Sequence, residues 1–87
     1  MDEPVALRIH GSRFLRWLDS LKDKRAVAII RARLNRVRLG DFGDSTPVGA
    51  GVGELRIDFG PGYRVYFGRD ADSVVILLCG GSKRTQS

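Results

Sequence analysis

The amino-acid sequence predicts an α+β domain in which two helices from the first half of the chain pack on a small, mainly antiparallel sheet. Three patterns predict it. Apolar residues recur at helical spacing between positions 14 and 37, they alternate with polar residues between 54 and 67, and a nearly continuous apolar run, SVVILLC, occupies 73–79. The expected order is β-α-α-β-β-β. A chain of 87 residues is long enough for one small hydrophobic core, so we expect a single domain over residues 1–87.

The first half of the chain contains a short strand and two amphipathic helices. Residues 5–10 alternate only in part, so they predict a weak strand that stops at Gly11. Ser12 and Asp23 are the expected N-caps of the two helices, because short polar side chains accept hydrogen bonds from free N–H groups. Gly40 is the expected C-terminal stop of the second helix. The predicted buried stripes are Phe14, Trp17, Leu18 and Leu21 in the first helix, and Val27, Ile30, Leu34 and Val37 in the second.

Residues 40–53, GDFGDSTPVGAGVG, read as a loop because glycine, proline and short polar residues dominate them. The GAGVG run has the composition of a phosphate-binding loop. Such loops lead from a strand into a helix, whereas this one leads into a predicted strand. We therefore expect no nucleotide site there.

Residues 53–70, GELRIDFGPGYRVYFGRD, predict a β-hairpin with one polar face. A three-residue loop at 60–62 would place Asp58 opposite Arg64 and Arg56 opposite Tyr66. A slip by one residue would set the apolar face of one strand against the polar face of the other, so the loop must have an odd length. The residues expected on the polar face are Glu54, Arg56, Asp58, Arg64 and Tyr66. This face is either a solvated surface with cross-strand ion pairs or a functional surface.

Positive charge is concentrated in the first half of the chain. Fifteen basic and ten acidic residues give a net charge of +5, and ten of the basic residues lie between positions 8 and 38 with only Asp19 and Asp23 among them. Four arginines lie on the second helix away from its apolar stripe: Arg31, Arg33, Arg36 and Arg38. They form either a solvated surface or a surface for a nucleic-acid backbone or an acidic partner. Composition does not separate these alternatives.

The remaining composition indicates a cytoplasmic protein without cofactors. The single cysteine, Cys79, has no partner for an internal disulfide, which fits a reducing compartment. No apolar run is long enough to span a membrane, and the first residues lack the apolar segment of a signal peptide. No cluster of His and Cys suggests a metal site. We expect no metal, no other cofactor and no membrane association.

Three segments carry a resemblance to a known superfamily: RFLRWLDSL, RLNRVRLGDFGDSTPVGAGVGELRIDFGPGYRVYF and VVILLCGGSKRTQ. They resemble the RelE/ParE toxins of toxin–antitoxin systems, above all the addiction-module killer proteins, which are HigB-like or phage Gp49-like. The resemblance covers residues 14–86. It implies a RelE-like fold and a small basic endoribonuclease that cleaves messenger RNA in the ribosomal A site. It also implies a cognate antitoxin, expected to be a small helix-turn-helix protein.

The implied reaction is attack of a ribose 2′-OH on the adjacent phosphate, without a metal. Arginine or lysine side chains stabilise the charge that builds up on the phosphate oxygens. By the resemblance, Arg64 matches the phosphate-stabilising arginine of the superfamily, and Arg56 lies where some members have a catalytic lysine. Lys83 or Arg84 lies near a second functional basic residue, and the alignment does not choose between them. Glu54 lies where RelE has a basic group, so it is either a base or an ion-pair partner.

The hairpin face, including Tyr66, is by this resemblance the RNA-facing wall, to which the arginines of the second helix add a binding surface. Members usually continue into a C-terminal helix, which the sequence lacks after Ser87, through truncation or natural shortening. We therefore expect residues 83–87 to be mobile and cleavage by this chain to be weak. Two other functions stay open: a ParE-like gyrase poison, and a truncated toxin that only binds RNA or antitoxin.

Overall fold

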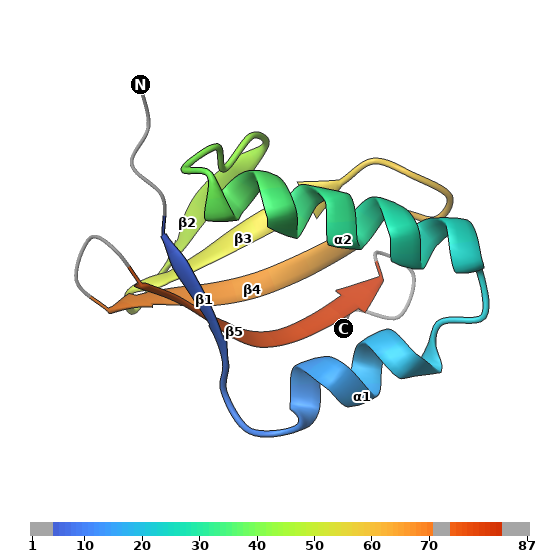
Figure 1. Cartoon of the computed structure of the whole chain (residues 1–87), viewed down its shortest axis with the longest axis horizontal. Helices are drawn as coiled ribbons and strands as arrows, with labels where there is room; N and C mark the ends of the chain where they lie inside the picture. Colours follow the sequence, from blue (N-terminus) through green and yellow to red (C-terminus); the bar gives the residue numbers. More distant parts are fainter. Residues whose placement is uncertain (1–4, 71–73, 83–87) are drawn as a thin grey trace.

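Two helices cover one face of a five-stranded sheet (Figure 1). The computed structural model describes residues 5–70 and 74–82. Its elements are β1 (Ala6–Ile9), α1 (Arg13–Ser20), α2 (Lys24–Arg38), β2 (Ser45–Gly49), β3 (Val52–Ile57), β4 (Tyr63–Asp70) and β5 (Val74–Ser82). The strand order is β1-β5-β4-β3-β2, and only the pair β1–β5 is parallel. The predicted α+β class with a mainly antiparallel sheet is confirmed, with one strand more than expected.

The predicted caps of α2 are confirmed at both ends. The Asp23 carboxylate accepts hydrogen bonds from the backbone N–H groups of Arg25 and Ala26, at 2.9 and 3.4 Å. At the other end Gly40 adopts φ 91°, and its N–H donates to the Val37 carbonyl at 2.9 Å. This left-handed conformation suits glycine and turns the chain out of the helix.

Helix α1 begins where expected, with Ser12 as its N-cap residue, but the predicted side-chain capping hydrogen bond is absent. Ser12 precedes the helix and its side chain makes no capping hydrogen bond. Its backbone is already in the helical region, at φ −110° and ψ −3°, whereas a capping serine normally has an extended backbone. The Arg16 N–H donates to the Ser12 carbonyl at 3.0 Å, and the side chains of Phe14 and Leu18 are buried.

The segment expected to be a loop, residues 40–53, contains the edge strand β2 and a tight turn into β3. Gly49, Ala50 and Gly51 all have positive φ values, of 102°, 54° and 76°. Glycine residues occupy two of these positions, and they adopt positive φ values without steric strain. Pro47 is tolerated because β2 lies at the edge of the sheet, where a missing N–H breaks few ladder bonds. GAGVG is thus a hairpin turn.

The hairpin of β3 and β4 has the predicted face but a different register. Arg56 lies opposite Arg64, and Glu54 lies opposite Tyr66. The connecting loop therefore has five residues, 58–62, rather than three. A turn closed by the Gly62 N–H and the Phe59 carbonyl, at 2.9 Å, forms inside that loop. The predicted pairing of Asp58 with Arg64 is wrong. The predicted odd length of the loop is confirmed, and it keeps the polar residues of both strands on one face.

The core lies between the helices and the sheet. Most of the predicted stripe residues are buried, and Trp17, Leu21 and Val27 are partly buried at its margin. The buried apolar residues are Val5, Phe14, Leu18, Ala26, Ile30, Leu34, Val37, Leu55, Ile57, Tyr63, Val65, Phe67, Val75 and Leu77.

Strand β5 runs further than the apolar pattern predicts, because Gly80 and Gly81 continue it instead of turning the chain. Gly80 makes room for the Trp17 ring: a Cβ there would lie 2.2 Å from Trp17 Cε3. The expectation of a mobile tail concerns residues 83–87, which lie outside the described part of the chain. No helix within the described residues is long and apolar enough to cross a membrane.

Candidate functional site

The face of the sheet opposite the helices carries the polar residues of the hairpin. Leu55, Ile57 and Val65 point into the core, so their neighbours in the alternating pattern point to the other side. Cross-strand pairing sets Arg56 next to Arg64 and Glu54 next to Tyr66. The structure therefore brings together four of the predicted site residues: Glu54, Arg56, Arg64 and Tyr66.

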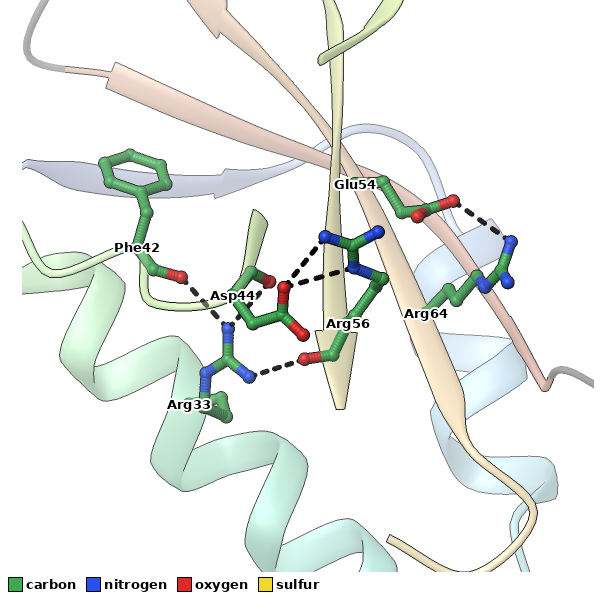
Figure 2. A network of polar contacts seen from close by, with 6 residues as sticks. All are labelled: Arg33, Phe42, Asp44, Glu54, Arg56 and Arg64. Carbon is green, nitrogen blue, oxygen red and sulfur yellow. Dashed lines mark hydrogen bonds and ion pairs between the residues drawn. The ribbon is translucent and has the colours of Figure 1, made fainter. Parts of the chain in front are cut away.

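Arg64 forms an ion pair with Glu54 on this face (Figure 2). The distance between Arg64 Nη1 and Glu54 Oε2 is 3.3 Å. Only 8% of the Glu54 side chain is exposed, against 29% for Arg64. A buried carboxylate needs a nearby cation to offset its lost hydration, and Arg64 supplies it. In turn, the carboxylate restricts the positions that the guanidinium group can adopt.

Arg56 is held by a second carboxylate, which the sequence analysis did not single out. Its Nε and Nη2 donate to Oδ1 of Asp44, at 3.1 and 2.9 Å. The backbone N–H of Arg56 also donates to the Asp44 carbonyl, at 2.9 Å. Asp44 lies just before β2, in the segment predicted to be a loop. Only recognition of the β2–β3 hairpin would have placed it beside Arg56.

Arg33 connects α2 with both partners of this ion pair (Figure 2). Its Nη1 donates to the Arg56 carbonyl at 2.6 Å, and its Nη2 donates to the carbonyls of Phe42 and Asp44 at 2.9 and 3.3 Å. Burial, with a further contribution from nearby Arg36, lowers the pKa of Arg33. Its Nε is buried without a hydrogen-bond partner among the described residues. Arg33, predicted to face RNA, thus directs its guanidinium group toward the backbone carbonyls of Phe42, Asp44 and Arg56.

The other arginines of α2 have different surroundings. Arg36 pairs with Asp41, with Nη2 to Oδ2 at 2.8 Å, and this hydrogen bond is the main reason why the pKa of Asp41 is lowered. Arg31 and Arg38 are exposed, and their side chains have no partner among the described residues. Because α2 covers the opposite face of the sheet, the structure does not bring these two arginines to the hairpin face (Figure 1).

Arg56 and Arg64 both line a cleft of ≈ 230 Å³. Asp44 and Asp58 contribute to its walls, so Asp58 joins the site from the loop although it does not pair with Arg64. A guanidinium group presents five N–H donors in a planar fork that suits a phosphate group. The two ion pairs leave several of these donors unused, so both arginines can still donate to a phosphate group in a cleft that Asp44 and Asp58 also line. Lys83 and Arg84 lie outside the described residues.

Comparisons with known proteins agree with the predicted family at the level of fold. No protein-family model matches the chain. An uncharacterized protein of Haemophilus influenzae is 54% identical over 70 residues, which are 80% of this chain and 71% of that protein. Among solved structures, a chain of the toxin–antitoxin complex RelBE2 from Mycobacterium tuberculosis is similar with a TM-score of 0.72. That similarity covers 95% of this chain and 98% of the other, at 20% sequence identity, and therefore shows a shared fold.

Proposed function

We propose that this chain, which belongs to one family with the Haemophilus influenzae protein and has a RelE/ParE-type fold, is the toxin of a type II toxin–antitoxin system and cleaves messenger RNA on the ribosome. One observation carries the proposal: Arg56 and Arg64 pair across two strands on the face that the helices leave open, and both line one cleft. The net charge of +5 fits an RNA substrate and an acidic antitoxin segment.

The cleft suits a transesterification that needs no protein nucleophile. The ribose 2′-OH loses its proton as its oxygen forms a bond to the adjacent phosphorus. The bond to the 5′-oxygen of the next nucleotide breaks and that oxygen takes up a proton, so a 2′,3′-cyclic phosphate and a 5′-hydroxyl result. Negative charge on the phosphate oxygens is greatest midway through this exchange. We propose that Arg64 and Arg56 stabilise it, since the ion pairs with Glu54 and Asp44 fix both guanidinium groups before the substrate arrives.

The roles of the remaining predicted residues follow from their surroundings. Glu54 accepts a hydrogen bond from Arg64, which supports a positioning role over that of a general base. Tyr66, opposite Glu54, is proposed to contact the RNA. Lys83 or Arg84 stays the proposed second basic group of the site. Of the arginines on α2, the exposed Arg31 and Arg38 remain proposed RNA contacts. They would bind a more distant part of the RNA, because α2 lies on the other side of the sheet.

A cleavage assay with programmed ribosomes tests the proposal. Purified chain is added to ribosomes that hold a defined codon in the A site, and primer extension maps the ends of the messenger RNA. We expect cuts that depend on the ribosome and fall at a fixed position within the codon. Cuts on free RNA alone would contradict ribosome dependence. Inhibition of gyrase supercoiling without RNA cuts would replace the proposal with the gyrase alternative.

The variants must separate chemistry from folding. Arg64→Ala alone leaves the buried Glu54 carboxylate without its cation, which costs stability. We therefore compare Glu54→Gln with Glu54→Gln/Arg64→Ala, in which no charge is left unpaired. The double variant is expected to cleave about 10²–10³-fold more slowly than the single one, the range found on removal of one transition-state donor. Lys22→Ala, an exposed residue between the helices, is the control that should cleave like the unmodified chain.

A further inference from the structure

A second cleft lies apart from the one that Arg56 and Arg64 line, between α1, the β1–α1 connection and β5. It measures ≈ 930 Å³. Helix α1 lies beside β5, beyond the point where the short strand β1 leaves the sheet (Figure 1). A β-bulge shapes its floor, because Cys79 pairs with Tyr66 and Leu77 pairs with Phe67, which leaves Leu78 without an opposite residue. The residues that line it are His10, Gly11, Ser12, Arg13, Arg16, Trp17, Leu78 and Cys79.

The described lining of this cleft is basic. Arg13 and Arg16 line it together with His10, and no carboxylate is among the described residues that line it. Both arginines are exposed, and neither side chain has a hydrogen-bond or ion-pair partner among the described residues. Arg56 and Arg64 differ from them in this respect, because each already faces a carboxylate. The cleft thus offers two unpaired guanidinium groups to an anion.

The cleft also contains an aromatic wall. Trp17 is half-buried: its ring packs over Gly80 and near Phe14 and Tyr63, while part of it lines the cleft. Proteins that bind single-stranded nucleic acid combine basic side chains for the phosphates with aromatic rings on which bases stack. An aromatic ring beside two arginines therefore favours a nucleotide chain over a simple inorganic anion.

Strand β5 connects the cleft with the hairpin, because it lines the cleft and pairs with β4. Cys79, on its floor, is the cross-strand neighbour of Tyr66, and Arg64 lies two residues further along β4. With strands about 4.8 Å apart and a rise of about 3.4 Å per residue, the Cα atoms of Cys79 and Arg64 are about 8 Å apart. A stacked strand rises about 3.4 Å along its axis per nucleotide, so about two to three nucleotides span this separation. A short strand is therefore long enough to reach from one cleft to the other.

We propose that the cleft between α1 and β5 is a second binding site for single-stranded RNA, in which Arg13 and Arg16 contact phosphates and Trp17 stacks on a base. This inference rests on the proposed function, from which RNA is taken as the ligand. It adds that the chain binds nucleotides of the RNA other than those at the cleaved bond. The site does not depend on cleavage, so its test uses RNA that cannot be cut.

Trp17 is the only tryptophan of the chain, so its fluorescence reports directly on this cleft. The full chain is titrated with a 2′-O-methyl oligouridylate of about ten nucleotides in about 50 mM salt, and again at higher salt. We expect saturable quenching. In Arg13→Ala/Arg16→Ala the affinity is expected to fall on the order of 50-fold in about 50 mM salt, and the slope of log K against log salt to fall by about 1.4, since each phosphate contact on a single strand contributes about 0.7.

Lys22→Ala/Lys24→Ala is the matched control, because it removes the same charge from exposed positions outside the cleft. It is expected to retain both the quenching and the salt slope, and thermal unfolding verifies that both double variants fold. Three outcomes would overturn the proposal: no quenching by RNA, equal losses in the two double variants, or quenching by an oligoglutamate of equal charge as strong as by RNA. Ribosomal cleavage without quenching would refute this site alone, and quenching without cleavage would refute the proposed reaction alone.

Discussion

Replacement of Arg33 by alanine is expected to destabilise the fold although the residue lies on an arginine-rich helix. The change removes hydrogen bonds to the carbonyls of Arg56 and Phe42, at 2.6 and 2.9 Å, and a longer one to Asp44. A hydrogen bond to a charged group contributes about 1.5 kcal/mol at the lower end of its range, so the two short bonds give about 3 kcal/mol. Because water can reach some of the freed carbonyls, we expect a loss of about 2–3 kcal/mol, or a fall in Tm of about 10–20 °C.

Thermal unfolding followed by circular dichroism measures this loss, and the same helix supplies the control. Arg31→Ala removes an exposed arginine without a described partner and is expected to change the stability by less than about 0.5 kcal/mol. Arg33→Lys keeps the charge but cannot donate in two directions from one plane, so it should recover only part of the loss. Equal Tm values for Arg33→Ala and Arg31→Ala would show that the hydrogen bonds of Arg33 to the backbone carbonyls do not stabilise the fold.

Two further predictions test the packing of β5 and the end of α2. Gly80→Ala should cost about 1–3 kcal/mol or more, because its Cβ would meet the Trp17 ring, whereas Gly81→Ala, with no atom within 4 Å, should be tolerated; chemical denaturation compares them. Arg36→Gln should raise the pKa of Asp41 toward its ordinary value of 3.8 in a carbon-detected NMR titration, and an unchanged midpoint would contradict the ion pair. Because the folded pKa is lowered, the contribution of Asp41 to stability is present above pH 3.8 and disappears as the pH falls through the folded value.

The sequence predicts the core and the shared hairpin face because both depend on periodicity. Leu55 and Val65 alternate with polar residues. Only a loop with an odd number of residues keeps these two side chains on the same face of the sheet. The length of the loop was not predictable in the same way. A turn within residues 59–62 adds two residues without any change of parity, so the apolar pattern is equally consistent with a three-residue and a five-residue loop.

The features that the sequence did not predict arise from contacts between distant segments. Strand β2 is short, contains Pro47 and pairs only at the sheet edge, so its residues lack a strand pattern. The pairing of Asp44 with Arg56 depends on that strand. Nothing in the spacing of the α2 arginines distinguishes Arg33 from Arg31. The difference arises because Arg33 faces the carbonyls of residues 42–56, a contact that only the tertiary fold creates.

Replacement of a single 2′-OH in the substrate tests the central claim most directly, since the proposed reaction needs that hydroxyl as its nucleophile. Ribosomes are programmed with two messenger RNAs that differ only by a 2′-deoxy nucleotide on the 5′ side of the mapped cut. We expect the all-ribose RNA to be cut to a 2′,3′-cyclic phosphate and a 5′-hydroxyl end, and the deoxy RNA to stay intact. Cleavage of both RNAs at the same rate would contradict it.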